Sequence, residues 1–128
     1  QRLPWLDGVA REIADAFRKD REEVARRMEV IIRSGVKFAA GTDGMHGELA
    51  KELEYIVGFG ASESQALAAG TRNAAAVLGL EGSVGTLEPG KFADIVAVQG
   101  NPLKDIRALK KVGTVISRGK VISSITGG

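Results

Sequence analysis

Apolar residues recur at helical spacing through the first quarter of the chain. The positions that share this spacing are Val9, Ile13, Phe17, Val24, Met28, Ile31 and Ile32. Because intervals of three and four residues fall on one face of a helix, the pattern predicts a helical region over residues 5–34. Asp20 followed by Glu23 resembles a capping box, so two helices that meet at residues 19–20 are an alternative to one. Gly35 is expected to end the helical region.

The pattern then changes from helical to strand-like. Residues 36–41 form a short, mostly apolar run that predicts a buried strand, and the polar, glycine-rich residues 42–47 predict a loop after it. A helix is expected next, with one apolar face made by Leu49, Leu53, Ile56 and Val57. Ser62 and Gln65 form a capping box that opens another helix. Residues 71–79 predict a short alanine-rich helix closed by its final glycine.

The last third of the chain has the pattern of β-structure. In residues 87–91 a proline precedes a glycine, which is typical of a type II turn, and Asn101-Pro102 predicts a second turn. The predicted strands are residues 93–98, 112–116 and 120–122. The last two strands read as a hairpin around Arg118-Gly119. The change from helix to strand places the expected boundary near Gly82, between a region of residues 1–82 and a region of residues 83–128.

Composition narrows the class of protein. The chain has 128 residues, 44% hydrophobic and 27% charged, as in one soluble globular domain. No apolar run reaches the roughly 20 residues needed to cross a bilayer, so no membrane span is expected. The net charge of +2 is spread over interleaved charges and the aromatics are scattered, which argues against nucleic-acid binding. The absence of cysteine excludes disulfides and fits a reducing, cytoplasmic compartment. Because the sequence opens at Gln1 without methionine or a signal pattern, we expect residues upstream of it.

The candidate for chemistry is Asp43, which follows the predicted strand 36–41. In a barrel of alternating strands and helices, catalytic residues lie at the carboxyl ends of strands. An aspartate there can bind a divalent metal and accept a proton from metal-bound water, whose pKa the metal lowers toward about 7. The alternative is that Asp43 caps the next helix or orders the turn through an Asx hydrogen bond, and the local pattern alone favours this alternative.

His46 is the only histidine of the chain and lies three residues after Asp43. A zinc site normally needs three or four protein ligands, and Asp43 with His46 falls short of that number. Further carboxylates would have to come from Glu48, Glu52 or Glu54, and the last two are expected on the polar face of a helix. A role for His46 in contacting substrate stays open.

Four segments, in order, carry a resemblance to a known family. They are Gly35–Asp43, Ala66–Ala75, Gly85–Val96 and Val115–Ile122. This series resembles the C-terminal portion of the amidohydrolase superfamily of metal-dependent hydrolases, and is most similar to the branch of imidazolonepropionases and prolidase-like and carboxypeptidase-like enzymes. The resemblance runs from about residue 8 to the end of the chain. Its most specific part is Gly-Thr-Leu-Glu-Pro-Gly-Lys-x-Ala-Asp, at residues 85–94.

The resemblance implies a fold and a site. The fold is α/β: the last strand and helices of a TIM-type (β/α)8 barrel, followed by strands of a small β-sandwich. In the family, the eighth barrel strand ends in an aspartate that binds the metal and activates the hydrolytic water, and Asp43 matches that position. The His-x-His pair, the lysine or glutamate and the two further histidines of the family have no counterpart here, so they are expected upstream. His46-Gly47 matches a His-Gly pair of the peptidase-like members.

The sequence therefore predicts a C-terminal piece of a cytoplasmic hydrolase that cleaves an amide or peptide C–N bond. The expected cofactor is a divalent metal, with zinc as the expected ion. The expected partners are a small amide or dipeptide substrate, the remainder of the hydrolase barrel and further copies of the protein in a homo-oligomer. The isolated chain is expected to be inactive. A non-catalytic interaction module and one half of a split enzyme are the competing hypotheses.

Overall fold

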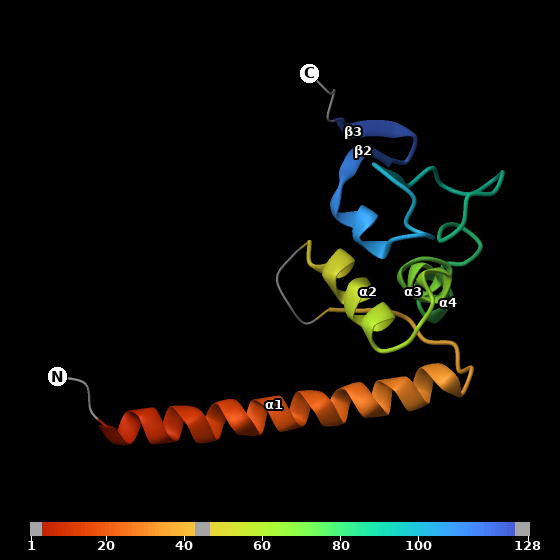
Figure 1. Cartoon of the computed structure of the whole chain (residues 1–128). Helices are drawn as coiled ribbons and strands as arrows, with labels where there is room; N and C mark the ends of the chain where they lie inside the picture. The colour runs from red at the N-terminus through yellow and green to blue at the C-terminus, as the bar shows by residue number, and fades with distance from the viewer. Residues whose placement is uncertain (1–3, 43–46, 125–128) are drawn as a thin grey trace.

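The computed structural model describes residues 4–42 and 47–124. A long helix leads into a group of shorter helices, and a small sheet lies on the opposite side of that group (Figure 1). In chain order the elements are α1 (Pro4–Arg33), α2 (Leu49–Gly58), α3 (Glu63–Gly70), α4 (Arg72–Val77), β1 (Ile95–Val98), the 3-10 helix η1 (Ile106–Lys110), β2 (Val112–Ser117) and β3 (Lys120–Ser124). Within the described ranges, no helix is long and apolar enough to cross a membrane.

The first helix is continuous, so the alternative of a break at residues 19–20 is wrong. Glu23 does not turn back to cap a second helix at Asp20. Its carboxylate accepts hydrogen bonds from Arg26 at 3.2 Å and from Arg27 at 2.8 Å, one turn further along α1. These guanidinium groups, Arg27 first, lower the pKa of Glu23. The helix ends as expected at Gly35, whose φ of +74° is a conformation that glycine adopts without strain.

Residues 36–41 do not form the predicted buried strand. They have no regular secondary structure, and Val36 is 59% exposed. A strand of this kind needs a neighbouring strand for its backbone hydrogen bonds, and the described part of the chain places its strands elsewhere, in the sheet of β1, β2 and β3. The segment instead contacts the helices, with Phe38 and Ala40 packed against the core.

The core lies between the helices and η1. Leu53 and Ile56, on the predicted apolar face of α2, are 4% and 3% exposed and form the centre of the cluster. Its other buried members are Ile32, Ala61, Ala66 and Ile106. Leu49, at the start of the same predicted face, is 38% exposed. Since Ile106 comes from η1, the core draws on chain from both sides of the expected boundary near residue 82.

The predicted capping box and the predicted alanine-rich helix are both present. The Ser62 hydroxyl accepts a hydrogen bond from the Gln65 amide at 3.2 Å, and the Gln65 side chain accepts one from the Ser62 amide at 2.9 Å. This reciprocal pair satisfies two amides that the start of α3 would otherwise leave free. The alanine-rich helix is α4, and Gly79 follows it with a φ of +68°.

The sheet has the order β1-β2-β3, and both pairs of strands are antiparallel. The predicted hairpin is present, and its turn residues Arg118 and Gly119 have φ values of +47° and +78°, as a tight I′-type turn requires. Each ladder contains one irregularity. Ala97 and Val98 of β1 pair with Thr114 and Val112, which leaves Gly113 as an extra residue in β2. Val115 and Ile116 pair with Ser123 and Val121, which leaves Ile122 as an extra residue in β3.

Candidate active-site segment

Asp43 and His46 lie outside the described residues, so the metal and substrate roles of these two side chains stay predictions. The structure does describe the chain that leads to them, up to Thr42, and the chain that resumes at Gly47. The described part of the candidate site is therefore the segment of residues 36–42 and the groups that hold it.

Two long-range hydrogen bonds tie this segment to the helices behind it. The amide of Ala40 donates to the carbonyl of Ala69 at 2.9 Å. The side-chain amide of Asn73 donates to the carbonyl of Phe38 at 3.0 Å, in a partly buried position. Ala69 is fully buried near the end of α3, where helix carbonyls lack partners within the helix. The segment is thus held by α3 through one of its amides and by α4 through one of its carbonyls.

An open groove of about 780 Å³ runs between the start of this segment and helices α3 and α4. Its charged lining groups are Lys37 and Arg72, and its polar ones include Ser64 and Asn73. The groove is lined by no histidine, cysteine, aspartate or glutamate from the part of the chain that the structure describes. These residues therefore do not form a metal-binding pocket.

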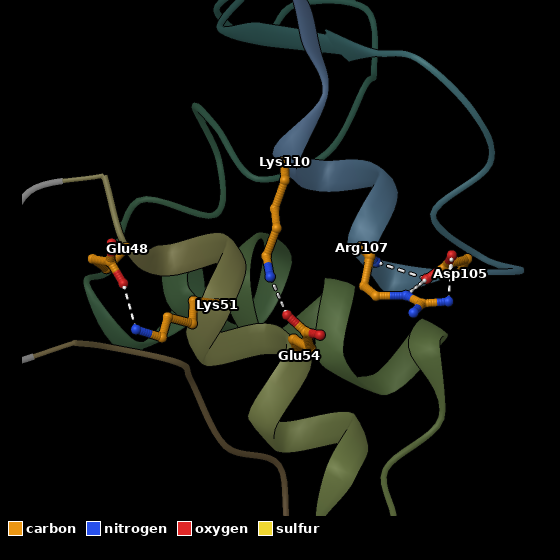
Figure 2. A network of polar contacts seen from close by, with 6 residues as sticks. All are labelled: Glu48, Lys51, Glu54, Asp105, Arg107 and Lys110. Atoms are coloured by element: carbon orange, nitrogen blue, oxygen red, sulfur yellow. Dashed lines mark hydrogen bonds and ion pairs between the residues drawn. The ribbon is translucent and has the colours of Figure 1, made fainter.

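The carboxylates elsewhere in the described chain do not form a metal site either. Between residues 4–42 and 47–124, no three histidine, cysteine, aspartate or glutamate side chains gather as a metal site would require. Ion pairs occupy two of the candidate carboxylates: Glu48 pairs with Lys51 at 3.3 Å, and Glu54 pairs with Lys110 (Figure 2). The described residues do not fit a metal by themselves.

The ion pair of Glu54 belongs to a contact between α2 and η1. Figure 2 shows Lys110 reaching down from η1 to Glu54 on α2, with Asp105 and Arg107 at the other end of the short helix. Asp105 caps η1 by accepting from the Arg107 amide at 3.0 Å, and its carboxylate also pairs with the Arg107 guanidinium at 2.9 Å. Hydrogen bonds from Arg107 lower the pKa of Asp105. This polar contact borders the buried Ile106 and supports the junction of helices and sheet.

The most specific part of the family resemblance, residues 85–94, has a structural role here. The predicted turn is present: the amide of Lys91 donates to the carbonyl of Glu88 at 3.2 Å, and Gly90 has a φ of +92°. The Lys91 ammonium pairs with Glu88 at 3.2 Å and also donates to the Thr86 hydroxyl. Hydrogen bonds from Lys91 and Thr86 to its carboxylate lower the pKa of Glu88.

The motif ends at Asp94, which fixes the turn of the terminal hairpin. Its carboxylate accepts from the amide of Arg118 at 2.7 Å and from the hydroxyl of Ser117 at 3.2 Å. The Arg118 guanidinium lies 5.6 Å from the ring centre of Phe92, within the range of a cation–π contact. The residues that best mark the family therefore hold the sheet together, and none of these contacts involves the segment before Asp43.

The described residues thus form helices, a segment held against them that leads to Asp43, and a three-stranded antiparallel sheet in place of the expected strands of a β-sandwich. The sequence matches the amidohydrolase family over residues 7–122. The chain belongs to this family. Its relatives place it in the branch that includes imidazolonepropionases and prolidases.

Three relatives illustrate the likeness. Imidazolonepropionase of Symbiobacterium thermophilum is 37% identical over 107 residues, which cover 77% of this chain and 24% of the relative. A crystal structure of a Xaa-Pro dipeptidase with methionine bound in its active site has a TM-score of 0.75 and 36% identity, over 79% of this chain and 26% of that one. Aspergillus niger ochratoxinase has a TM-score of 0.71 and 32% identity, over 81% and 25%. The chain thus spans about a quarter of the length of these relatives.

One residue that holds the candidate segment was not predicted from the sequence. Asn73 was assigned only to a short alanine-rich helix, whereas its side chain reaches a carbonyl 35 residues earlier. The only signal available was a polar side chain at the start of a helix that is otherwise rich in alanine.

Proposed function

We propose that this chain is the C-terminal part of a metal-dependent amidohydrolase that cleaves an amide or peptide C–N bond. The observation that supports this most is the structural likeness to a Xaa-Pro dipeptidase, at a sequence identity well above that of fold-only similarity. Relatives named as a dipeptidase and as an imidazolonepropionase suggest a dipeptide, an acyl amino acid or a cyclic amide as substrate. The cysteine-free sequence suits the cytoplasm, where we place the protein.

In this proposal Asp43 is a metal ligand and the general base. A divalent metal, with zinc as the expected ion, supplies a more acidic bound water when present. Asp43 takes a proton from the attacking water while the oxygen of that water bonds to the carbonyl carbon. It then passes the proton to the leaving nitrogen as the C–N bond breaks, so that one water is consumed and an acid and an amine are released. His46 would contact the substrate beside it.

The remaining metal ligands would come from the remainder of the barrel. Exposed apolar side chains on one face of α1 support such a partner: Ile13 is 51% exposed, Val24 54% and Ile31 42%. Helix α1 extends away from the other elements (Figure 1). Surfaces of this kind normally pack against further protein. Assembly of the whole enzyme into a homo-oligomer stays a prediction.

The test compares two proteins: the longer protein that carries this sequence and the 128-residue chain, each purified with zinc. Both are incubated with Xaa-Pro dipeptides, N-acyl amino acids and imidazolone propionate. We expect turnover only by the longer protein, and a fall in kcat/KM of at least about 100-fold for Asp43→Asn, because loss of a general base typically costs about 10²- to 10⁴-fold. The matched control is Glu22→Gln, an exposed carboxylate on α1, which should leave kcat/KM unchanged.

Three results would contradict the proposal. Full activity in Asp43→Asn would remove the catalytic role of this residue, and absence of C–N hydrolysis by the longer protein would remove the function. Turnover by the 128-residue chain that Asp43→Asn abolishes would show that the chain is catalytically complete. In the absence of any activity, a monodisperse 128-residue chain with a cooperative thermal transition would favour the non-catalytic interaction module. Co-purification of a separate protein with a His-x-His pair would favour the split enzyme.

A further inference from the structure

Residues 36–42 lead directly into Asp43 but lack the ladder of hydrogen bonds that fixes a strand in a sheet. Their position depends on contacts with the helices, including the bond from Ala40 to Ala69 and the bond from Asn73 to Phe38. The bonded groups of the segment, the Phe38 carbonyl and the Ala40 amide, are two residues apart and only five and three residues before Asp43. A shift of the segment at these points would be passed along a short length of backbone to Asp43.

We propose that Asn73 is a positioning residue for Asp43, acting through the carbonyl of Phe38. The inference rests on the proposed function, because it assigns Asn73 to the same reaction. Asn73 touches neither substrate nor the reacting atoms in this assignment. Its side-chain amide fixes where the segment lies against α4, and the segment in turn carries the general base.

The support behind Asn73 is rigid, which is what a positioning residue needs. The corner between α3 and α4 is closed by the Thr71 hydroxyl, which donates to the Leu67 carbonyl at 2.6 Å. Two residues along α4, Ala75 is 5% exposed and packs closely against the backbone at Gly85. The side-chain amide of Asn73 therefore projects from a helix that is held on both sides, by the corner at Thr71 before it and by the packing of Ala75 against Gly85 after it.

The chemistry of the contact requires a donor. The Phe38 carbonyl is an acceptor, so Asn73 must present its NH2 group, and the acceptor-only carboxylate of an aspartate would face the carbonyl with like partial charge. Aspartate has nearly the size of asparagine and is favourable in the first turn of a helix, where it interacts with the helix dipole. Asn73→Asp thus removes the hydrogen bond to the Phe38 carbonyl. It keeps the size of the side chain nearly unchanged and does not destabilise the start of α4.

The first measurement needs no activity. Hydrogen exchange of the Ala40 amide is followed by NMR in the 128-residue chain for the wild type, Asn73→Asp, Asn73→Ala and the control Ser64→Ala. Ser64 lines the same groove from α3. We expect exchange of the Ala40 amide to become about fivefold faster in both Asn73 variants, since loss of one hydrogen bond typically changes the free energy by about 1 kcal/mol, and 1.4 kcal/mol would be a factor of ten. Ser64→Ala should exchange at the wild-type rate. Unchanged exchange in both Asn73 variants would overturn the inference.

The second measurement uses the longer protein. Asn73→Asp is expected to lower kcat by about tenfold or more while KM stays within about twofold, because a small displacement of a catalytic group slows the chemical step more than it weakens binding. An unchanged kcat together with faster exchange would overturn the positioning role and leave the proposed function intact. A wild-type protein that hydrolyses no C–N bond would instead remove the proposed function, and the positioning role with it. The two failures are therefore distinguishable.

Discussion

Ile106 is the side chain whose loss should damage this fold most clearly. It is 4% exposed and packs from η1 into the cluster around Leu53 and Ile56 of α2. Ile106→Ala removes three carbon atoms, which at about 0.8 kcal/mol per buried carbon amounts to roughly 2.4 kcal/mol of lost burial. The cavity left behind adds to this, because the rigid α2–α3 pair can close it only in part. We expect a loss of about 3 kcal/mol in the free energy of unfolding.

The assay is urea denaturation of the 128-residue chain, followed in parallel by far-UV circular dichroism for the helices and by NMR amide signals of β2 for the sheet. Ile122→Ala is the matched control, because the same atoms are removed from a side chain that is 66% exposed on β3. The control should change the free energy of unfolding by less than about 0.5 kcal/mol. In Ile106→Ala both probes should shift to lower urea together, since the residue joins the two parts of the chain.

Two results would refute this reasoning. Equal effects of Ile106→Ala and Ile122→Ala would mean that burial at η1 does not determine the stability of the chain. A shift of the sheet signals alone, with the helices unchanged, would mean that the core does not span the expected boundary near residue 82, and that the two regions unfold independently.

Two further predictions concern the loop at residue 85 and the cap of η1. Gly85→Ala should cost at least about 2 kcal/mol in thermal or urea unfolding, because a Cβ at its φ of +93° would lie 2.6 Å from the Ala75 Cβ. The control is Gly90→Ala, because Gly90 has a φ of +92° with open space around it. This change measures the backbone strain alone and should cost only about 1 kcal/mol. Equal losses of stability in the two variants would exclude the clash with Ala75. Hydrogen bonds from Arg107 hold the pKa of Asp105 below its ordinary value near 3.8. The ionised Asp105 therefore stabilises the fold at pH values above 3.8, and this stabilisation is lost as the pH falls through the lower pKa of the folded state. Arg107→Ala should return the pKa of Asp105 toward 3.8 in a carboxyl NMR titration, and an unmoved pKa would contradict this cause.

The sequence predicted best those elements whose cause is local. The capping box of Ser62, the turn around Gly90 and the hairpin turn at Arg118-Gly119 all depend on residues within a few positions of one another, and each is present. The capping signal at Asp20 was misleading because a carboxylate three residues later can equally pair with arginines ahead of it. In α1 it does so, through Arg26 and Arg27.

Features that depend on contacts between distant parts of the chain could not be predicted from the sequence. Residues 36–41 have the composition of a buried strand, yet strand formation depends on a neighbour that composition cannot show. The role of Ile106 in the helical core and the reach of Asn73 to Phe38 also depend on how distant segments meet. Asp43 was a candidate from its position after an apolar run, but the local pattern favoured a helix cap or turn, and only the family resemblance favoured a catalytic base.

The two outer strands of the sheet present different edges to any further strand. The extra residue of one ladder, Ile122, lies in the outer strand β3, whereas that of the other, Gly113, lies in the central strand β2. A bulge disturbs the even spacing of amide and carbonyl groups along its own strand. The outer edge of β3 is therefore irregular, while that of β1 keeps the regular spacing that an incoming strand can match. A further strand is therefore expected to pair with the free edge of β1 rather than with that of β3.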